Sequence, residues 1–513
     1  MLIEQANGEL VFALIAPVGT DYRSVADHLR AQLFSFGYTS ESIRLSEAIA
    51  TYCEQLNVSP DLIWQSEYER IKKHMGGANA LYRRFNEVCD LEEANALLAL
   101  HAIAEIHEQR IENDKERALL GKAHIILTLK RPEEVTYLRR VYGLGLHVIS
   151  VFSPEEDRVS FLMHKQHLPK SEAKELVKSD ENDSEDGGQR TGDAFFLADL
   201  FIDTADLWQQ QINRYLELLF SHPYRTPSRD EQAMFMAFGA SLRSAQLGRQ
   251  VGAAITNSSG DLIAIGCNEV PGPGGGQYWE GSVGDKRDHI LGSDSNDLEK
   301  KRIQNELLQL LPDDHCNDPK LKAAFRKSSL FGITEFGRAV HAEMEALSSC
   351  ARRGISTQDA ILYTTTFPCH NCARHIVGFG IKRVVYIEPY PKSKATELHD
   401  DAITSYAMER APGAENQVKF TPFVGISPRR YGELFTVLPT YGREVKRKDK
   451  ATGNAVDWRR ESSELRFQMY PFSYVEREKL AVTRLGEQMK QRTLPFKEPN
   501  AKEEPGDERA NEQ

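Results

Sequence analysis

Short apolar runs alternate with amphipathic segments along the first part of the chain, and this alternation strongly constrains the fold. Strand-like runs occupy residues 9–16 (ELVFALIA), 123–129 (AHIILTL) and 146–152 (LHVISVF). A helix is expected from about Asp21, and PEEVTYLRRVYG begins with proline and acidic residues, as helix N-termini do. Strands that alternate with helices predict a parallel α/β domain.

The rest of the chain indicates further units, because 513 residues exceed what one hydrophobic core supports. The charged residues 169–193 predict a solvated loop or linker, and SHPYRTPSRD marks a domain boundary near 221–229. A hairpin (RQVGAAITN and DLIAIGCN) and a helix–strand–helix–strand pattern from His341 then predict a second α/β domain with a mixed sheet. The expected division is a first domain at 1–222, a second at 230–440 with an insertion at about 281–340, an extension at 441–496 and a disordered tail at 497–513.

Composition limits the classes of partner and location. No apolar run approaches the length of a membrane span, and MLIEQANGELVF carries acidic residues where a signal peptide has a basic start, so a cytoplasmic protein is expected. The net charge of -11 argues against long nucleic acids, which require clustered Lys and Arg. Seven scattered cysteines, an odd number, predict reduced thiols rather than a disulfide framework.

Two of those thiols, Cys369 and Cys372, lie in YTTTFPCHNCARHIVGFG, where a strand pattern runs into a helix. Taken alone, this Cys-x-x-Cys pair suits a thioredoxin-like redox site, half of a structural zinc site, or two ligands of a catalytic metal. A structural zinc needs two further ligands at knuckle spacing, and Cys350 lies at the far end of a helix with no partner beside it. The pair therefore leaves three interpretations open.

The segment HAEMEAL, from His341 to Leu347, favours the catalytic interpretation. His341 with Cys369 and Cys372 would give zinc three protein ligands and leave a fourth position for water. Glu343 lies two residues after His341, in the first turn of the same helix, where its carboxylate can reach that water without binding the metal. Zinc lowers the pKa of bound water from ~15.7 towards ~7, and Glu343 would act as the proton carrier for that water.

The joint pattern H-x-E…P-C-x-x-C is the signature of zinc nucleobase deaminases. With residues 241–270 (SLRSAQLGRQVGAAITNSSGDLIAIGCNEV), it resembles the deoxycytidylate deaminase branch of the cytidine deaminase superfamily over roughly 230–440. The resemblance implies that Asn268 holds the deoxyribose or the adjoining phosphate, and that the backbone N–H of Ala342 meets the pyrimidine O2. An Asn in a Gly/Pro loop is also often only a turn residue.

The N-terminal part is similar to P-loop nucleotide kinases at 9–21 and 194–219, with a degenerate phosphate loop. The loop candidates are Ala16, Gly19, Thr20 and Asp21. APVGTDYRS has no lysine, although a P-loop requires G-x-x-x-x-G-K-[ST], and an Asp there would repel a polyphosphate. Binding, regulation or assembly is therefore expected of this domain, rather than phosphoryl transfer.

The chain as a whole resembles the bacterial anti-phage dCTP deaminases. Its degenerate kinase-like domain is followed by such a deaminase and then by VKFTPFVGISPRRYGELF. That resemblance implies conversion of dCTP to dUTP, and also of dCMP to dUMP, a homo-oligomer, and for some members an inhibitory small RNA. Arg429 and Arg430 are candidates for the substrate phosphates, or simply a solvated pair.

Other functions and sites stay open at this point. The alternatives are a housekeeping deoxycytidylate deaminase for dTMP synthesis, a polynucleotide cytosine or adenosine deaminase, and a non-catalytic nucleotide sensor. The insertion contains His289, His315 and Cys316, which would suit a second metal or an effector, or only a surface elaboration.

Overall fold

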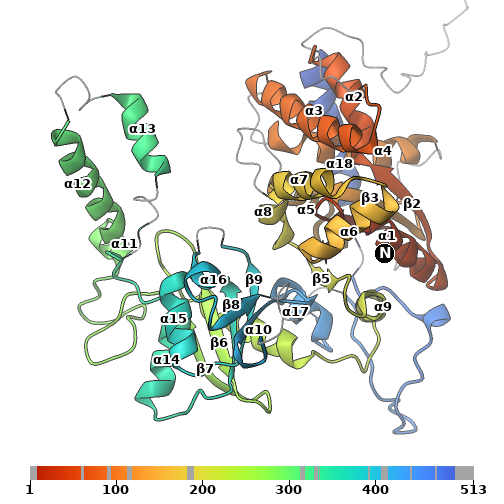
Figure 1. The fold of residues 1–513 in the computed structure, drawn as a ribbon. Coiled ribbons are helices and arrows are strands. Elements are labelled where there is room, and N and C mark those ends of the chain that lie inside the picture. The colour runs from red at the N-terminus through yellow and green to blue at the C-terminus, as the bar shows by residue number, and fades with distance from the viewer. Residues whose placement is uncertain are drawn as a thin grey trace, which may run out of the picture.

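The protein folds around two six-stranded sheets, and Figure 1 shows the computed structural model. The structure describes residues 8–58, 63–88, 94–112, 118–181, 190–311, 318–328, 333, 335–390, 393–405, 414–439, 442–467, 469 and 471–490. None of the helices in these ranges is long and apolar enough to cross a membrane.

The first sheet has the strand order β12-β5-β4-β1-β3-β2. Its strands are β1 (Leu10–Ile15), β2 (Thr39–Arg44), β3 (Lys122–Leu129), β4 (Leu146–Phe152), β5 (Leu200–Asp203) and β12 (Gly425–Ile426). Strands β1 to β5 run parallel, and β12 is antiparallel to β5. Because helices cover both faces, β1 is buried along its whole length. The predicted parallel α/β fold is confirmed.

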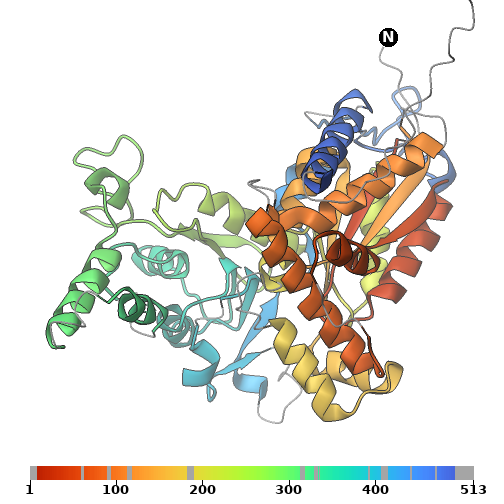
Figure 2. The ribbon, with the colours of Figure 1, turned by 90° about the horizontal axis from the view of Figure 1, so that it is seen from above.

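Helices pack on both faces of this sheet (Figure 2). They are α1 (Tyr22–Ser35), α2 (Leu45–Gln55), α3 (Glu67–Val88), α4 (Leu97–Glu112), α5 (Pro132–Tyr142), α6 (Glu155–Lys165), α7 (Lys170–Glu181), α8 (Thr191–Phe195), α9 (Trp208–Leu219) and α18 (Pro471–Lys490). Two short 3-10 turns, Ala94–Ala96 and Gly143–Gly145, precede α4 and β4.

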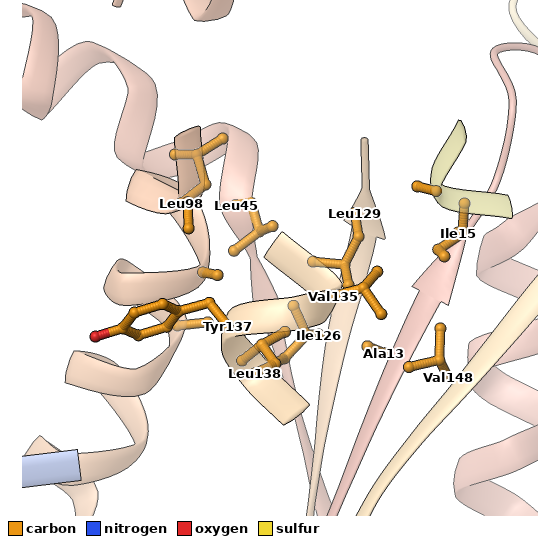
Figure 3. Close-up of a cluster of buried hydrophobic side chains, with 14 of the residues drawn as sticks. Ala13, Ile15, Leu45, Leu98, Ile126, Leu129, Val135, Tyr137, Leu138 and Val148 are labelled. Carbon is orange, nitrogen blue, oxygen red and sulfur yellow. The ribbon is translucent and has the colours of Figure 1, made fainter. Parts of the chain in front are cut away.

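Alternate residues of β1 enter two different cores. Ala13 and Ile15 belong to the core that includes α5, which Figure 3 shows in close-up. Phe12 and Leu14 belong to the core that includes α1 and α9. This two-sided burial follows from the period of two along a strand.

One segment differs from its prediction. The expected solvated loop at 169–193 contains α7, whose Ala173, Leu176 and Val177 are buried against α6. The spacing of these three residues places them on one helical face, and the many charged residues around them hid that pattern. Residues 182–189 of the expected loop lie outside the described part of the chain.

The second sheet has the order β10-β11-β9-β8-β6-β7. Its strands are β6 (Gly252–Thr256), β7 (Leu262–Cys267), β8 (Ile361–Thr366), β9 (Arg383–Glu388), β10 (Ile403–Ser405) and β11 (Val418–Pro422). Strands β6 and β7 form the predicted antiparallel hairpin, and β6 is also antiparallel to β8. The β8–β9, β9–β11 and β11–β10 pairs are parallel, so the sheet is mixed, as predicted.

The helices of the second unit include those of the insertion. They are α10 (Arg229–Ser241), α11 (Asp288–Leu291), α12 (Ser295–Gln309), α13 (Pro319–Lys327), α14 (Ala342–Arg352), α15 (His370–Gly378), α16 (Ala395–Leu398) and α17 (Pro428–Phe435). A 3-10 turn at Ala414–Asn416 precedes β11, and another lies at Arg460–Ser462. Figure 1 shows α12 and α13 projecting away from both sheets.

After the second sheet the chain returns to the first. Strand β12 extends the first sheet. Helix α18 packs against α4 and α5, and both ribbon views show this helix beside the helices of the N-terminal unit (Figures 1 and 2). The buried guanidinium of Arg110 on α4 bonds to Glu9 at 2.6 Å and to Glu478 of α18 at 2.6 Å. The described part of the expected extension at 441–496 therefore packs on the N-terminal unit. The expected disordered tail at 497–513 lies outside the described residues.

Candidate active site

Three side chains from two segments meet at one place in the second unit. His341 Nδ1 lies 3.3 Å from Cys369 Sγ and 3.4 Å from Cys372 Sγ. The possible ligand atoms of these three residues all lie within 4.8 Å of one another. The structure thus brings together the three residues that the sequence pattern predicts as metal ligands.

Backbone pairing positions His341. Val340 and Glu269 exchange two backbone hydrogen bonds of 3.1 and 3.2 Å, and His341 then becomes the N-cap of α14. Gly266 of β7 allows α14 to approach, because a Cβ there would lie 2.3 Å from the carbonyl oxygen of Ala342. The imidazole therefore projects from a helix start that is held tightly against the sheet.

The two thiols lie at the start of α15, directly after β8. Cys369 is the N-cap, and its sulfur accepts a hydrogen bond from the N–H of Cys372 at 3.5 Å. The N-terminus of a helix stabilises negative charge, which favours thiolates at this position. Both thiols are buried, with exposed fractions of 7% for Cys369 and 1% for Cys372.

Glu343 lies beside the cluster without belonging to it. Its carboxylate accepts a hydrogen bond from Cys372 Sγ at 3.5 Å, and its side chain is buried in the first turn of α14. Burial raises the pKa of Glu343, since charge is disfavoured away from water. A buried carboxyl with a raised pKa suits proton transfer near neutral pH.

The donor groups of the cluster shift one another's pKa values. Hydrogen bonds from Cys372 and His341 lower the pKa of Cys369 to about 4, although burial opposes this. The hydrogen bond to Cys369 raises the pKa of His341 to about 9. An imidazole nitrogen and two thiol sulfurs are the donor types that zinc prefers, and three ligands leave a fourth tetrahedral position. The donor set therefore fits a zinc ion with an open position.

This arrangement argues against the redox and structural-zinc interpretations of Cys369 and Cys372. Within the described part of the chain, His341, Cys369 and Cys372 are the one group of three or more metal-ligating side chains. Cys350 is buried in α14 and is not part of that group. His289 of the insertion is exposed on α11 and is also outside the group, whereas His315 and Cys316 lie outside the described residues.

Asn268 follows β7 and holds the adjacent backbone. Its Oδ1 accepts from the N–H of Val251 at 2.7 Å, and its Nδ2 donates to the carbonyl of Arg249 at 2.8 Å. These bonds give Asn268 a structural role in the turn, and its predicted sugar contact stays a prediction. Ala342 is the first residue of α14 and is fully buried beside His341.

The two arginines of α17 have different surroundings. Arg429 is exposed. Arg430 is only 6% exposed, donates to the carbonyl of Leu144 at 3.2 Å and pairs with Glu433 at 3.1 Å. A buried guanidinium that is engaged with the N-terminal unit is not presented to a substrate phosphate, so the structure argues against the candidate role of Arg430.

The loop of the N-terminal unit is separate from this cluster. Ala16 follows β1, Gly19 has a φ of 86°, and Thr20 is buried. Asp21 is the N-cap of α1, and its carboxylate accepts from Ser24 N at 3.2 Å and Ser24 Oγ at 2.7 Å. The acidic residue that departs from the P-loop pattern thus caps the helix itself.

Glu269 is a positioning residue that sequence reasoning did not identify. Its buried carboxylate accepts from the N–H of Ala245 at 2.9 Å and of Val270 at 2.8 Å, while its backbone pairs with Val340 next to His341. In the sequence, Glu269 stands between Asn268 and the apolar Val270. This neighbourhood was the available sign that Glu269 is buried, and a buried carboxylate needs hydrogen-bond partners.

Comparison with known proteins identifies this region. Residues 227–388 match the family model described as the cytidine and deoxycytidylate deaminase zinc-binding region. Together with the donor set, this match confirms zinc as the predicted cofactor.

Curated relatives match this chain over short stretches. The deoxycytidylate deaminase of Enterobacteria phage T2 is 46% identical over 55 residues, which are 11% of this chain and 29% of that protein. ComE operon protein 2 of Bacillus subtilis (strain 168) is 41% identical over 66 residues, which are 13% of this chain and 35% of the relative. The chain thus spans about a third of the length of these relatives.

Among solved structures, the dCMP deaminase of cyanophage S-TIM5 in complex with dCMP and dUMP is similar, with 18% identity and a TM-score of 0.22. The match covers 38% of this chain and 99% of that one. Because the identity and the TM-score are low, the assignment rests on the family model and the curated relatives. Residues 227–388 of this chain therefore match the zinc-binding region of cytidine and deoxycytidylate deaminases.

Proposed function

We propose that the protein is a zinc-dependent hydrolase that converts dCTP to dUTP, and also dCMP to dUMP, with release of ammonia. The observation that carries this proposal is the cluster of His341, Cys369 and Cys372 with the buried carboxyl of Glu343 beside it. A metal site with three protein ligands and an adjacent proton carrier is suited to attack by water on C4 of cytosine.

The chain's own residues have distinct roles in the proposed reaction. His341, Cys369 and Cys372 would hold the zinc ion, which lowers the pKa of the water that it binds. Glu343 would take a proton from the attacking water and give it to N3 of the ring. It would then carry the hydroxyl proton of the C4 adduct to the amino group, which leaves as ammonia as the C4 carbonyl forms. Hydrogen bonding by the buried N–H of Ala342 would orient the pyrimidine through O2.

Asn268 and Arg429 are the candidates for recognition of the sugar and the phosphates. Asn268 would contact the deoxyribose with the donor and acceptor capacity that remains beyond its two backbone bonds. Arg429, exposed on α17, stays the candidate for a phosphate, because a guanidinium binds phosphate oxygens in pairs.

A second candidate is a deoxycytidylate deaminase with a housekeeping role in dTMP synthesis; the phage T2 relative is named deoxycytidylate deaminase. A polynucleotide deaminase is disfavoured by the net charge of -11, which opposes binding to a long phosphate backbone. The choice between dCTP and dCMP depends on contacts beyond the sugar.

The proposed cellular role is depletion of the dCTP pool as a defence against phage. It rests on the resemblance of the whole layout to anti-phage dCTP deaminases, and the same resemblance supplies the proposals of a homo-oligomer and an inhibitory small RNA.

The experiment is a substrate comparison with purified full-length protein. Ammonia release is measured separately with dCTP, dCMP, CTP and deoxycytidine at equal concentrations. We expect dCTP to give the highest kcat/KM and dCMP to be a second substrate. A strong preference for dCMP would favour the housekeeping role, and ammonia from none of the four would contradict the proposal.

A further inference from the structure

The insertion of the second unit is closed at its base by hydrogen bonds between the segments that enter and leave it. Arg338, near the end of the insertion, donates to the carbonyl of Lys286 at 2.9 Å and to the carboxylate of Asp288 at 3.1 Å. The hydroxyl of Ser295 donates to the carbonyl of Phe336 at 2.8 Å. These bonds lie around α11, at the root of the projecting helices α12 and α13 (Figure 1).

Asp288 of α11 also binds a third segment, the turn before β6. One of its carboxylate oxygens accepts from Arg338, and the other accepts from Gln246 Nε2 at 3.0 Å. Asp288 is only 3% exposed, so these two donors take the place of the water that a carboxylate otherwise binds. Gln246 lies 42 residues before Asp288 and Arg338 lies 50 residues after it, so one carboxylate joins segments that are distant in sequence.

The turn at residues 244–251 is bonded to Asn268 as well. The Asn268 side chain binds two backbone groups of the turn, and the hydroxyl of Ser244 donates to the Asn268 carbonyl at 2.7 Å. Gln246 lies between these contacts along the chain. A displacement of Gln246 would therefore move the backbone that orients the Asn268 side chain.

The segment that contains Arg338 leads directly into the zinc cluster. Val340, two residues later, pairs with the backbone of Glu269, and His341 then follows as the N-cap of α14. The carboxylate that binds both Arg338 and the turn thus ties the turn to the segment that carries a candidate zinc ligand.

We propose that Asp288 is a positioning residue for the deaminase reaction. It holds the turn at 244–251, and with it Asn268, in place for the sugar of a nucleotide whose base lies at the zinc cluster. This inference rests on the proposed function, which places the nucleotide between Asn268 and the zinc ligands. The base of the insertion then belongs to the scaffold of the active site and is more than a surface elaboration.

Asp288→Asn tests the two hydrogen bonds at nearly constant side-chain size. The new side chain has one acceptor oxygen, and its NH2 group would face one of the two donors, Gln246 or Arg338. Because the sugar is bound equally before and during the reaction, KM for dCTP and dCMP should rise by about ten-fold or more, with kcat within about three-fold of the wild-type value. Zinc content should not change. Asp297→Asn is the matched control, because Asp297 is exposed on α12 of the same insertion and pairs with Lys300.

A second substitution tests the bond to Gln246 specifically. Adding Gln246→Glu to Asp288→Asn reverses the polarity of this contact, since the NH2 group at position 288 can then donate to a carboxylate at position 246 while its oxygen still accepts from Arg338. We expect this double variant to recover KM to within about three-fold of the wild-type value, because the two sites are coupled. Gln246→Glu alone should raise KM, because two carboxylates would then face each other.

Three kinetic results would overturn the proposal. Unchanged KM in Asp288→Asn would show that the turn keeps its place without the insertion. A loss of zinc, or a lower kcat at unchanged KM, would place the role of Asp288 at the metal. An absence of recovery in the double variant would show that substrate binding does not depend on the bond to Gln246.

Hydrogen–deuterium exchange tests the same bonds without any turnover. In Asp288→Asn, exchange should become faster at residues 244–251 and 338–341 and stay unchanged in α15. Faster exchange throughout the second unit would mean that Asp288 supports folding in general, and unchanged exchange in the turn would contradict the proposal. An inactive wild type would contradict the proposed function instead, and the exchange pattern would still decide whether Asp288 holds the turn.

Discussion

At the scale of single residues, the active-site proposal depends on two helix N-termini that the fold brings together. His341 is the N-cap of α14 and Cys369 is the N-cap of α15, so both side chains lie at helix starts. Hydrogen bonds join His341 to both thiols.

Replacing one thiol tests the ligand set. Cys369→Ser or Cys372→Ser should lose most of the bound zinc, because a neutral hydroxyl is a much poorer zinc ligand than a thiolate. The measurement is metal analysis of purified, dialysed protein. Cys350→Ala is the matched control, a buried thiol of α14 outside the cluster, and it should keep its zinc. Full zinc content in either Ser variant would return the pair to a redox role.

At the scale of helices and strands, the site depends on close contact between α14 and β7. Gly266 permits that contact, because the nearest atoms to a Cβ there would be backbone atoms of Ala342 and Ala346, at 2.3 and 2.6 Å. Backbone atoms cannot turn aside as a side chain can, so the helix itself would have to move.

Adding a single methyl group at Gly266 should therefore displace α14 and disturb the metal ligands. Gly266→Ala should lower the free energy of unfolding by about 1–3 kcal/mol, the usual range for overpacking, and should reduce zinc content. Gly239→Ala is the control, because this glycine of α10 has open space around it and alanine favours a helix by about 0.5–1 kcal/mol. Urea denaturation with metal analysis measures both effects, and an unaltered Gly266→Ala protein would refute the packing argument.

The helices and strands also show how much of the fold can be predicted from sequence patterns. Strands β1, β3 and β4 and the helix after the Cys-x-x-Cys turn were predicted because their apolar periodicity is clear. Helix α7 was missed because three apolar residues among many charged ones give a weak pattern. The zinc ligands could be predicted from a motif, whereas the role of Glu269 could not, because its partner Ala245 is distant in sequence and only folding brings the two together.

At the scale of the whole molecule, the C-terminal helix is fastened to the N-terminal unit by a buried ionic group. Arg110 lies between Glu9 and Glu478, and Tyr474 of α18 also donates to Glu9 at 2.6 Å. The sequence separation of 368 residues between Arg110 and Glu478 explains why no local pattern predicted this closure.

Removing the central charge should be strongly destabilising. Arg110→Met leaves two buried carboxylates without their cation, which typically costs about 3–5 kcal/mol. Thermal and urea unfolding of the full-length protein measure this loss. Arg30→Met is a control, because Arg30 forms an exposed pair with Asp27 on α1 and should change stability little. A similar stability for both variants would mean that the buried group does not hold α18.

The same group predicts sensitivity to acid. Burial opposes ionisation of Glu9, but hydrogen bonding and charge from His124 and Arg110 outweigh it and lower its pKa from 4.5 to about 2. Since the folded state holds the proton more weakly than the unfolded state, the stabilisation is present above pH 4.5 and is lost as the pH falls towards 2. Urea midpoints measured between pH 6 and pH 3 should fall more for the wild type than for Glu9→Gln. Parallel curves would contradict this assignment.

The most direct test of the central claim is ammonia release from dCTP and dCMP by Glu343→Ala beside the wild type, with zinc content measured in the same preparations. Glu343 lies against the cluster but is not one of its three donors. The account predicts that Glu343→Ala keeps its zinc and loses at least about 100-fold in turnover, because a proton carrier typically contributes 10²–10⁴-fold. Appreciable turnover in zinc-loaded Glu343→Ala would contradict it.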